Sequence, residues 1–502
     1  MKARLTMKKL TAATAAVTML SSTASLGAFA YTDSGSYNNT FSFTNSGITA
    51  SDGSGSGFKI SGTDLTINEA GTYVVSGECA EGSIKVKKGT TGVILILDSL
   101  TLTSSSTAPV SVNKGAEAEI VIKGSNTLTD SEDPANETST DTTIADAFEG
   151  AGIKVKTGSA LTLTGSGTLT VNGSSCKNGI KGGATSVVTV GESSADNFTL
   201  NVNAANNALA ADGELIINGG NINVTSADDG IKASPDDDDT ESKGVITING
   251  GNITVTSTDD AVHAENVNIL GGDLTINGGD DALKAEYELT VGKAGGSGPE
   301  INVTKAYEGF EGATINLRGG KGTLRTSDDG MNAANSELSN YSYALNISGG
   351  EWYVNADGDG LDSNGNMTVS GGYTQVFGSA NDGNGALDIG DHGCSLTYSG
   401  GTIAAVGMSG MAVVPTAGTY ISFGAGGGMG GPGGPGGGGW GGPGGGGWGG
   451  PGSSDQGSSQ SGTSISISSG ASIAVKDSSG NTVYETTAVK NANHIVLASD
   501  AL

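Results

Sequence analysis

The sequence predicts an all-β fold, a parallel β-helix with three short strands in each coil, on the basis of two observations. First, the unit at 267–287 recurs upstream at 248–264 and 217–233 with nearly the same residues. Second, 87 of the 502 residues are Gly and only 5% are aromatic, which suits a thin core between tight turns. A unit this short cannot bury its apolar edge alone, so it must stack on its neighbours.

Each unit divides into three strands separated by turns. In 267–287, a Gly pair ends the first apolar stretch, and a second strand alternates at 274–276. A Gly-Gly-Asp-Asp turn then leads to the third strand at 282–285, with Leu283 expected to point inward and Lys284 outward. The unit therefore contains all three strands of one coil.

The interval between the Gly pair and the acidic pair is constant, which fixes the length of the strand between them. Extra residues fall in one connecting loop, as in other repeat proteins. A fifth unit at 347–362 keeps the same frame, with Gly358 and Asp359 at the acidic positions. The four matching positions of the second Gly and first Asp are Gly220/Asp228, Gly251/Asp259, Gly272/Asp280 and Gly320/Asp328.

The first 30 residues have the features of a secretory signal peptide. A basic start is followed by a small and apolar run, and Ala28-Phe29-Ala30 forms a small-x-small cleavage site before Tyr31. No other stretch reaches the roughly 18 apolar residues of a membrane span. The net charge of −28 makes nucleic acid a poor partner. We therefore expect a secreted monomer without membrane insertion, either free or attached to the cell surface.

Composition divides the rest of the chain into four parts. A Ser-, Asn- and Gly-rich stretch at 31–57 predicts a flexible N-terminal segment. Alternating apolar residues from Phe58 predict a β-helix domain over 58–423. The range 424–463 is a Gly-, Pro- and Ser-rich insertion that we expect to be mobile. Alternation returns at 464–502, where we expect strands that cap the C-terminal end.

Several motifs together resemble a known family. They are G-T-Y-V-V-S-G at 71–77, L-T-G-S-G-T-L-T-V-N-G at 163–173, N-G-I-K-G at 178–182 and the repeated Gly-Gly and Asp-Asp unit. The stretch 58–406 is similar to calcium-containing β-helix carbohydrate-binding proteins that plant-cell-wall-degrading anaerobes secrete, whose fold is like that of polysaccharide lyases. The resemblance implies a right-handed helix, bound Ca²⁺, and affinity for cellulose and for pectic polygalacturonate.

The paired Asp residues independently favour a metal site. Stacked coils place equivalent residues about 4.8 Å apart, and two carboxylates at that distance repel by roughly 1 kcal/mol even in water. Oxygen-rich rows on flexible Gly turns suit Ca²⁺ better than Mg²⁺. The alternative is that Asp and Gly only form good turns. The expected Ca²⁺ ligands are Asp228, Asp229, Asp259, Asp260, Asp280, Asp281, Asp328, Asp329, Asp357, Asp359 and Asp362.

Three functions remain open, and binding is the one that the pattern favours. A binding protein would hold polysaccharide (pectate or cellulose) through Ca²⁺, with Lys232, Lys284, Trp440 and Trp448 as carbohydrate-binding residues. A pectate lyase would instead use Ca²⁺ to acidify a proton that a Lys removes. Because residues of several kinds occupy the Lys position in other units, we expect no catalytic residue there. The third possibility is a structural adhesion solenoid.

Overall fold

Residues 1–34, which include the predicted signal peptide 1–30, lie outside the residues that the computed structural model describes. Most of the insertion 424–463 lies outside them too, including Trp440 and Trp448. The described residues are 35–53, 55–173, 175–235, 239, 241–391, 393–424, 458–461 and 464–502.

The described chain is all-β, as the sequence predicts. Its two helices are short: η1, a 3-10 helix at Pro134–Thr138, and α1, a single α-helical turn at Thr142–Ala145. Neither helix is long and apolar enough to cross a membrane. In the described residues, one sheet contains 37 strands, and β37 and β38 form a second sheet.

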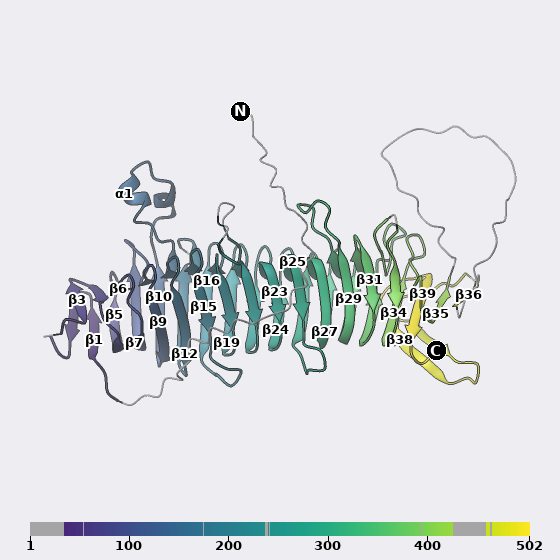
Figure 1. The fold of residues 1–502 in the computed structure, drawn as a ribbon, viewed down its shortest axis with the longest axis horizontal. Helices are drawn as coiled ribbons and strands as arrows, with labels where there is room; N and C mark the ends of the chain where they lie inside the picture. Colours follow the sequence, from purple (N-terminus) through teal and green to yellow (C-terminus); the bar gives the residue numbers. More distant parts are fainter. Residues whose placement is uncertain are drawn as a thin grey trace. The chain divides into compact units, whose positions relative to one another are not determined.

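Three parallel ladders make up the middle of the large sheet, because each strand pairs with the strand three elements further along (Figure 1). The first ladder contains β9 (Glu117–Lys123), β12 (Ala160–Gly165), β15 (Val187–Val190), β18 (Glu214–Ile217) and β21 (Val245–Ile248). The second contains β10 (Ser125–Asp130), β13 (Thr168–Gly173), β16 (Thr199–Ala204), β19 (Asn221–Ser226) and β22 (Asn252–Thr256). The third contains β8 (Val110–Val112), β11 (Ala151–Val155), β14 (Asn178–Gly182), β17 (Leu209–Ala211), β20 (Ile231–Ala233) and β23 (Val262–Ile269).

From β23 onward, some consecutive strands of the chain join without a turn between them. Each resulting long strand takes part in two ladders. The parallel pairing continues without a break to β34. These strands are β24 (Asp273–Asn277), β25 (Leu283–Val291), β26 (Glu300–Ala306), β27 (Phe310–Thr326), β28 (Met331–Ala333), β29 (Ala344–Ala356), β30 (Leu361–Ser363), β31 (Asn366–Val369), β32 (Tyr373–Phe377), β33 (Leu396–Tyr398) and β34 (Thr402–Gly407).

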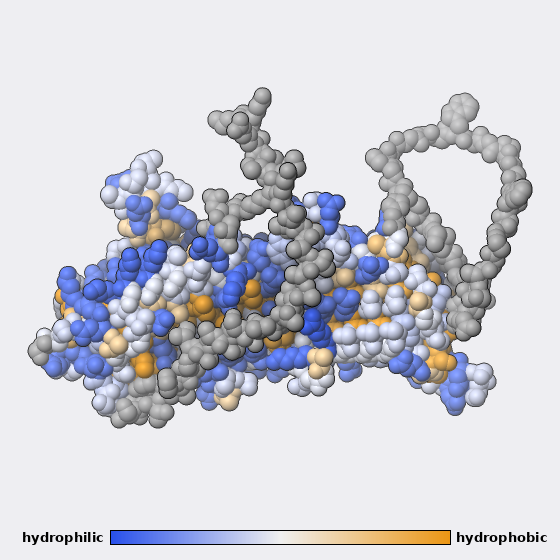
Figure 2. All heavy atoms as spheres, viewed as in Figure 1, coloured by the Kyte–Doolittle hydropathy of each residue, from blue (hydrophilic) through white to orange (hydrophobic). Residues whose placement is uncertain are grey.

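The core is a stack of aliphatic side chains that point inward from the ladders. In the second ladder, Leu200, Ile222, Ile253 and Leu274 are successive partners, and all are almost fully buried. Because equal positions of paired strands lie about 4.8 Å apart, each apolar row is continuous. On the face that Figure 2 shows, hydrophilic and neutral residues cover most of the described surface and hydrophobic ones appear between them.

One large side chain interrupts these aliphatic rows and shows how closely the interior packs. Trp352 pairs in register with Gly322, and a Cβ at Gly322 would lie only 2.8 Å from the Trp352 ring. The indole also contacts Phe310 edge-on, with ring centroids 5.8 Å apart. Gly322 is thus the residue that leaves room for the indole, as close packing of protein interiors requires.

The prediction of a flexible segment at 31–57 is wrong for most of the described residues there. The strands β1 and β2 pair with each other, and β1 also pairs in parallel with β5. The polar composition hides an alternation in which Phe41 and Phe43 are buried. The N-terminal strands are β1 (Asn39–Thr44), β2 (Gly47–Ala50), β3 (Phe58–Ser61), β4 (Asp64–Ile67), β5 (Gly71–Cys79), β6 (Ser83–Val86) and β7 (Val93–Ser104).

The C-terminal residues form two separate features. The strand β39 pairs antiparallel with β34 and with β35, which ends the run of parallel strands. The β37–β38 hairpin packs instead on outward-facing residues of the last strands, where Tyr484 lies against a cluster that includes Phe377. These strands are β35 (Tyr420–Phe423), β36 (Ser458–Ser461), β37 (Ser472–Lys476), β38 (Thr482–Thr487) and β39 (His494–Ser499).

Candidate functional site

Three rows of polar side chains cross the repeats where the second strand of each repeat turns into the third. The register of the third ladder aligns the residues of each row. The inner row is Asn207, Asp229, Asp260, Asp281, Glu308, Asp329 and Asp359. The outer row is Asn206, Asp228, Asp259, Asp280, Tyr307 and Asp328. The strand row is Lys181, Ala210, Lys232, His263, Lys284, Glu311, Asn332 and Asp362.

In the first half of the inner row, side-chain oxygens accept backbone N–H groups of the next repeat. Oδ1 of Asn207 accepts the N–H of Asp229 at 3.1 Å, and Oδ1 of Asp229 accepts that of Asp260 at 3.2 Å. Oδ1 of Asp260 accepts the N–H of Asp281 at 2.9 Å. The three Asp residues are at most 4% exposed. One oxygen of Asp229 and one of Asp260 therefore stabilise the turns, and the second oxygen of each faces a basic side chain of the strand row.

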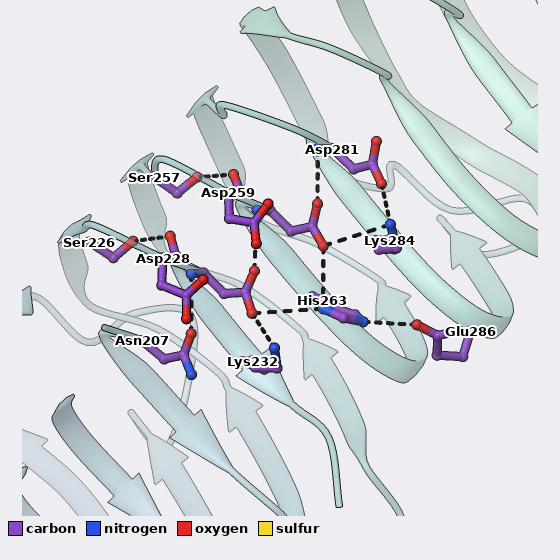
Figure 3. A network of polar contacts seen from close by, with 12 residues as sticks. Asn207, Ser226, Asp228, Lys232, Ser257, Asp259, His263, Asp281, Lys284 and Glu286 are labelled. Carbon is purple, nitrogen blue, oxygen red and sulfur yellow. Dashed lines mark hydrogen bonds and ion pairs between the residues drawn. The ribbon is translucent and has the colours of Figure 1, made fainter. Parts of the chain in front are cut away.

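Basic side chains of the strand row compensate the first half of the inner row (Figure 3). Nζ of Lys232 lies 2.5 Å from Oδ2 of Asp229, and Nζ of Lys284 lies 2.8 Å from Oδ2 of Asp281. Between them, Nδ1 of His263 lies 3.3 Å from Oδ2 of Asp260. Each of these pairs joins residues three positions apart, so the Asp-Asp-x-x-Lys spacing of the sequence produces an ion pair within one turn.

His263 is held in its charged form. Burial alone would lower the pKa of His263, but hydrogen bonds with Asp229 and Glu286 raise that pKa to about 9. Burial likewise raises the pKa of Asp260 to about 6, although Lys284 and His263 oppose the rise. Burial also raises the pKa of Asp281, and a side-chain hydrogen bond with Glu311 raises this pKa further. The first half is thus a mixed network of acids and bases.

The second half of the rows is acidic without compensation. Burial and the neighbouring carboxylates raise the pKa of Glu308 to about 8 and that of Asp329 to about 6. The same two causes raise the pKa of Asp359 and of Asp362 to about 7. Among the described residues, none of these four carboxylates forms an ion pair with Lys or Arg. Asn332 and Asp362 occupy the strand-row positions that Lys232, His263 and Lys284 hold in earlier repeats, so these repeats lack a basic side chain there.

Three carboxylate groups along these rows have the spacing of metal ligands. In each, one atom from every member lies within 4.8 Å of the others. The first two groups share Asp259, so the outer row and the inner row face each other across consecutive repeats there. The three groups are Asp228, Asp229 and Asp259; Asp259, Asp260 and Asp280; and Asp281, Glu308 and Glu311. A fourth group contains His263 with Asp229 and Asp260.

The remaining predicted ligands do not join such groups within the described residues. Asp357 instead lies 2.7 Å from Nζ of Lys490, so the C-terminal segment already compensates its charge. Gly358 stands beside Asp328 and Asp329, and a Cβ there would lie 2.4 Å from Oδ1 of each. This close approach explains why the fifth repeat has Gly where the others have Asp.

A hollow lies beside the three rows at Ala210, which has the smallest side chain in the strand row. Ala210 follows Lys181 and precedes Lys232 in register, and its short side chain leaves a cavity of about 390 Å³. Both lysines and Asn207 line this cavity. Each Lys is paired with an Asp, Lys181 with Asp212 and Lys232 with Asp229. A carboxylate entering the hollow would meet two ammonium groups and an amide, but also the Asp212 carboxylate that already pairs with Lys181.

A second groove, of about 600 Å³, lies on the outward face of the second ladder. Tyr353 and Tyr373 line it together with Glu300 and Lys321, and the buried Trp352 forms part of its base. Tyr373 is 39% exposed. No sequence motif indicates this groove, because its residues come from four separate strands, β26, β27, β29 and β32.

These features define the class of protein: an all-β protein of parallel ladders with acidic, oxygen-rich rows and an aromatic groove on its surface. A family model described as "Carbohydrate-binding domain-containing protein" matches residues 61–340, more than half of the chain. The chain belongs to this family of carbohydrate-binding domain-containing proteins, and the predicted carbohydrate-binding resemblance is confirmed.

The chain is similar to the "polysaccharide lyase-like protein from C. thermocellum", solved as a gadolinium derivative, at 28% sequence identity and a TM-score of 0.42. The match covers 50% of this chain and 96% of that one. No curated protein matches the chain.

Proposed function

We propose that this chain is a secreted protein that binds acidic plant-cell-wall polysaccharide, pectate, through Ca²⁺ held by the inner and outer rows. The observation that carries the proposal is the set of carboxylate groups whose oxygens lie within 4.8 Å of one another. Membership of a carbohydrate-binding family supports the ligand class. The net charge of −28 argues that a bare polyanion would be repelled and needs a bridging cation.

We also infer that the large sheet coils as a right-handed parallel β-helix with three strands per turn. The three-element offset of the parallel ladders supports this geometry. Parallel crossovers within one sheet are almost always right-handed. In such a coil the rows would follow one edge, so several cations and several uronate residues of an extended chain could align along it.

The ligand atoms favour Ca²⁺ over other common cations. Asp259 and Asp260 with Asp280 offer only carboxylate oxygens, and turn carbonyls lie beside them. Ca²⁺ takes six to eight oxygen ligands in flexible geometry, whereas Mg²⁺ requires near-ideal octahedral geometry. A site with three protein carboxylates leaves positions for a carboxylate of the glycan. The hollow between Lys181 and Lys232 would accept the next uronate carboxylate.

The aromatic groove is the proposed surface for neutral glycans such as cellulose, because the flat faces of Tyr rings suit the apolar faces of sugars. We expect Tyr373→Ala to weaken retention on insoluble cellulose by about tenfold, or ~1.4 kcal/mol, and to leave pectate binding unchanged. The measurement is a depletion isotherm on each polysaccharide. Tyr287→Ala removes a ring of similar exposure, 37%, outside the groove and serves as the control. Equal cellulose binding by wild type and Tyr373→Ala would remove the groove from the account.

The proposal favours binding over lyase chemistry. A lyase base must be able to accept a proton, but Asp281, Asp260 and Glu311 raise the pKa of Lys284 although burial opposes this. We therefore expect no ultraviolet absorbance from unsaturated uronates when the protein is incubated with polygalacturonate and Ca²⁺. Steady product formation that disappears in Lys284→Ala would establish a lyase in place of a binding protein.

A further inference from the structure

We propose a second kind of metal site, formed by Asp130, Glu132 and Cys176, that binds a borderline divalent cation such as Zn²⁺. One ligand atom from each of these residues lies within 4.8 Å of the others. The group shares no member with the inner, outer or strand row. Its ligands also differ in kind, because a sulfur atom joins two carboxylates.

The three residues come from two consecutive repeats. Asp130 is the last residue of β10, and Glu132 follows it at the start of the insertion that carries η1 and α1. Cys176 lies in the turn between β13 and β14, in the next repeat. All three side chains are buried, with exposures of 0%, 3% and 6% in chain order. Few ionisable groups are buried to this degree without a partner, because the cost is high.

The Asp130 carboxylate provides a second, independent observation. Its Oδ1 accepts the backbone N–H of Glu132 at 2.9 Å. Its Oδ2 is buried and accepts no N–H or O–H donor of the described residues, and the Cys176 thiol lies beside the carboxylate. Buried polar atoms in native proteins nearly always have a partner, so an unpaired carboxylate oxygen beside a thiol and a second carboxylate indicates an absent ligand.

The ligand set decides which cation fits. Ca²⁺ and Mg²⁺ bind oxygen ligands and do not select a thiolate. Zn²⁺ binds Cys sulfur together with Asp or Glu oxygen, commonly with four ligands in all. Three protein ligands would leave one position for water. The site would therefore discriminate against the Ca²⁺ that the acidic rows are proposed to bind.

Such a cation would fasten the insertion to the body of the sheet. The Glu132 carboxylate already accepts the N–H groups of Glu149 and Gly150, where the insertion returns, at 3.2 Å and 3.0 Å. A metal bound to Glu132 and Cys176 would add a link from this base to the next repeat. Figure 1 shows the insertion, which contains α1, projecting from the stacked strands. With the cation bound, both ends of this insertion would be anchored to the sheet.

The experiment is a titration of the metal-free full-length protein with Co²⁺, which reports thiolate binding by a sulfur-to-cobalt charge-transfer band. We expect the band to saturate at one Co²⁺ per chain and to disappear when Zn²⁺ is added. The band should be lost in Cys176→Ser and retained in Cys79→Ser and Cys394→Ser, which remove the other two thiols. Asp130→Asn, which keeps the volume of the side chain, should weaken Co²⁺ binding at least tenfold.

The outcomes are distinct from those of the Ca²⁺ proposal. Cys176→Ser should keep Ca²⁺-dependent pectate binding, which also shows that the variant is folded. Absence of the band in the wild type, or its persistence in Cys176→Ser, would overturn the zinc site. If Cys176→Ser does not fold, Asp130→Asn decides: wild-type Co²⁺ affinity in that variant contradicts the proposal.

Discussion

A variant in which Asp259, Asp260, Asp280 and Asp281 are replaced by Asn is expected to lose binding to polygalacturonate. Three of these residues form one complete carboxylate group, and Asp281 belongs to the next one. Asn preserves size and turn preference but removes four charges and most of the affinity for a hard cation. We expect retention on polygalacturonate to fall at least a hundredfold, or ~2.7 kcal/mol, while cellulose retention changes little. Depletion isotherms on both polysaccharides measure this.

Charge alone must be separated from site geometry. A control variant with Glu78, Glu241, Glu337 and Glu485 replaced by Gln removes the same number of charges from exposed positions. It should bind pectate as well as the wild type or slightly better. Because the Asp260 carboxylate also accepts the backbone N–H of Asp281, the Asn variant must be measured well below its Tm. Wild-type pectate affinity in the folded Asn variant would exclude the rows as the binding site.

The second large effect concerns the uncompensated half of the rows. In metal-free protein, we expect Tm to fall by several degrees as the pH rises from about 5 to about 8. Folding raises the pKa of Glu308 to about 8, that of Asp359 to about 7 and that of Asp362 to about 7. The folded state therefore holds more protons than the unfolded state in this range, so stability decreases with pH. Each pKa unit corresponds to about 1.4 kcal/mol.

His263 contributes in the same direction at higher pH. Its folded pKa of about 9 lies above its ordinary value of 6.5, so its stabilisation is complete below about pH 6.5 and is lost as pH rises through 9. Excess Ca²⁺ should reduce the fall, because a bound cation replaces the protons. Melting curves at several pH values, with chelator and with Ca²⁺, measure both effects. A Tm that rises or stays constant with pH in the chelated protein would contradict this account.

The repeat itself could be predicted from the sequence with unusual detail. The constant interval from Gly251 to Asp259 and from Gly272 to Asp280 sets the register, and the structure pairs Asn252 with Asp273 in agreement with it. Periodicity identifies which residues align, because one unit copies the next. It therefore identified the Asp residues of both rows, and it placed Lys284 outside the core.

Other features depend on long-range packing and left no periodic signal. Glu308 and Glu311 join Asp281 in one carboxylate group, although their part of the sequence lacks the Asp pair. Only their register with Asp281 and Lys284 could have identified them. The pairing of β1 with β5, the aromatic groove and the Asp130 group bring together residues from different repeats or from an insertion. Such contacts follow from the three-dimensional arrangement and from no local pattern.

The most direct test of the central claim is sedimentation of the wild-type protein with insoluble polygalacturonate in Ca²⁺, in chelator, and in chelator followed by excess Ca²⁺. The account predicts that the protein sediments in the first and third conditions and stays in solution in the second. It also predicts that cellulose binding is the same in all three. Equal sedimentation with polygalacturonate in chelator and in Ca²⁺, by a protein that atomic absorption shows to be free of metal in the chelated sample, would contradict the claim that Ca²⁺ on the acidic rows holds the glycan.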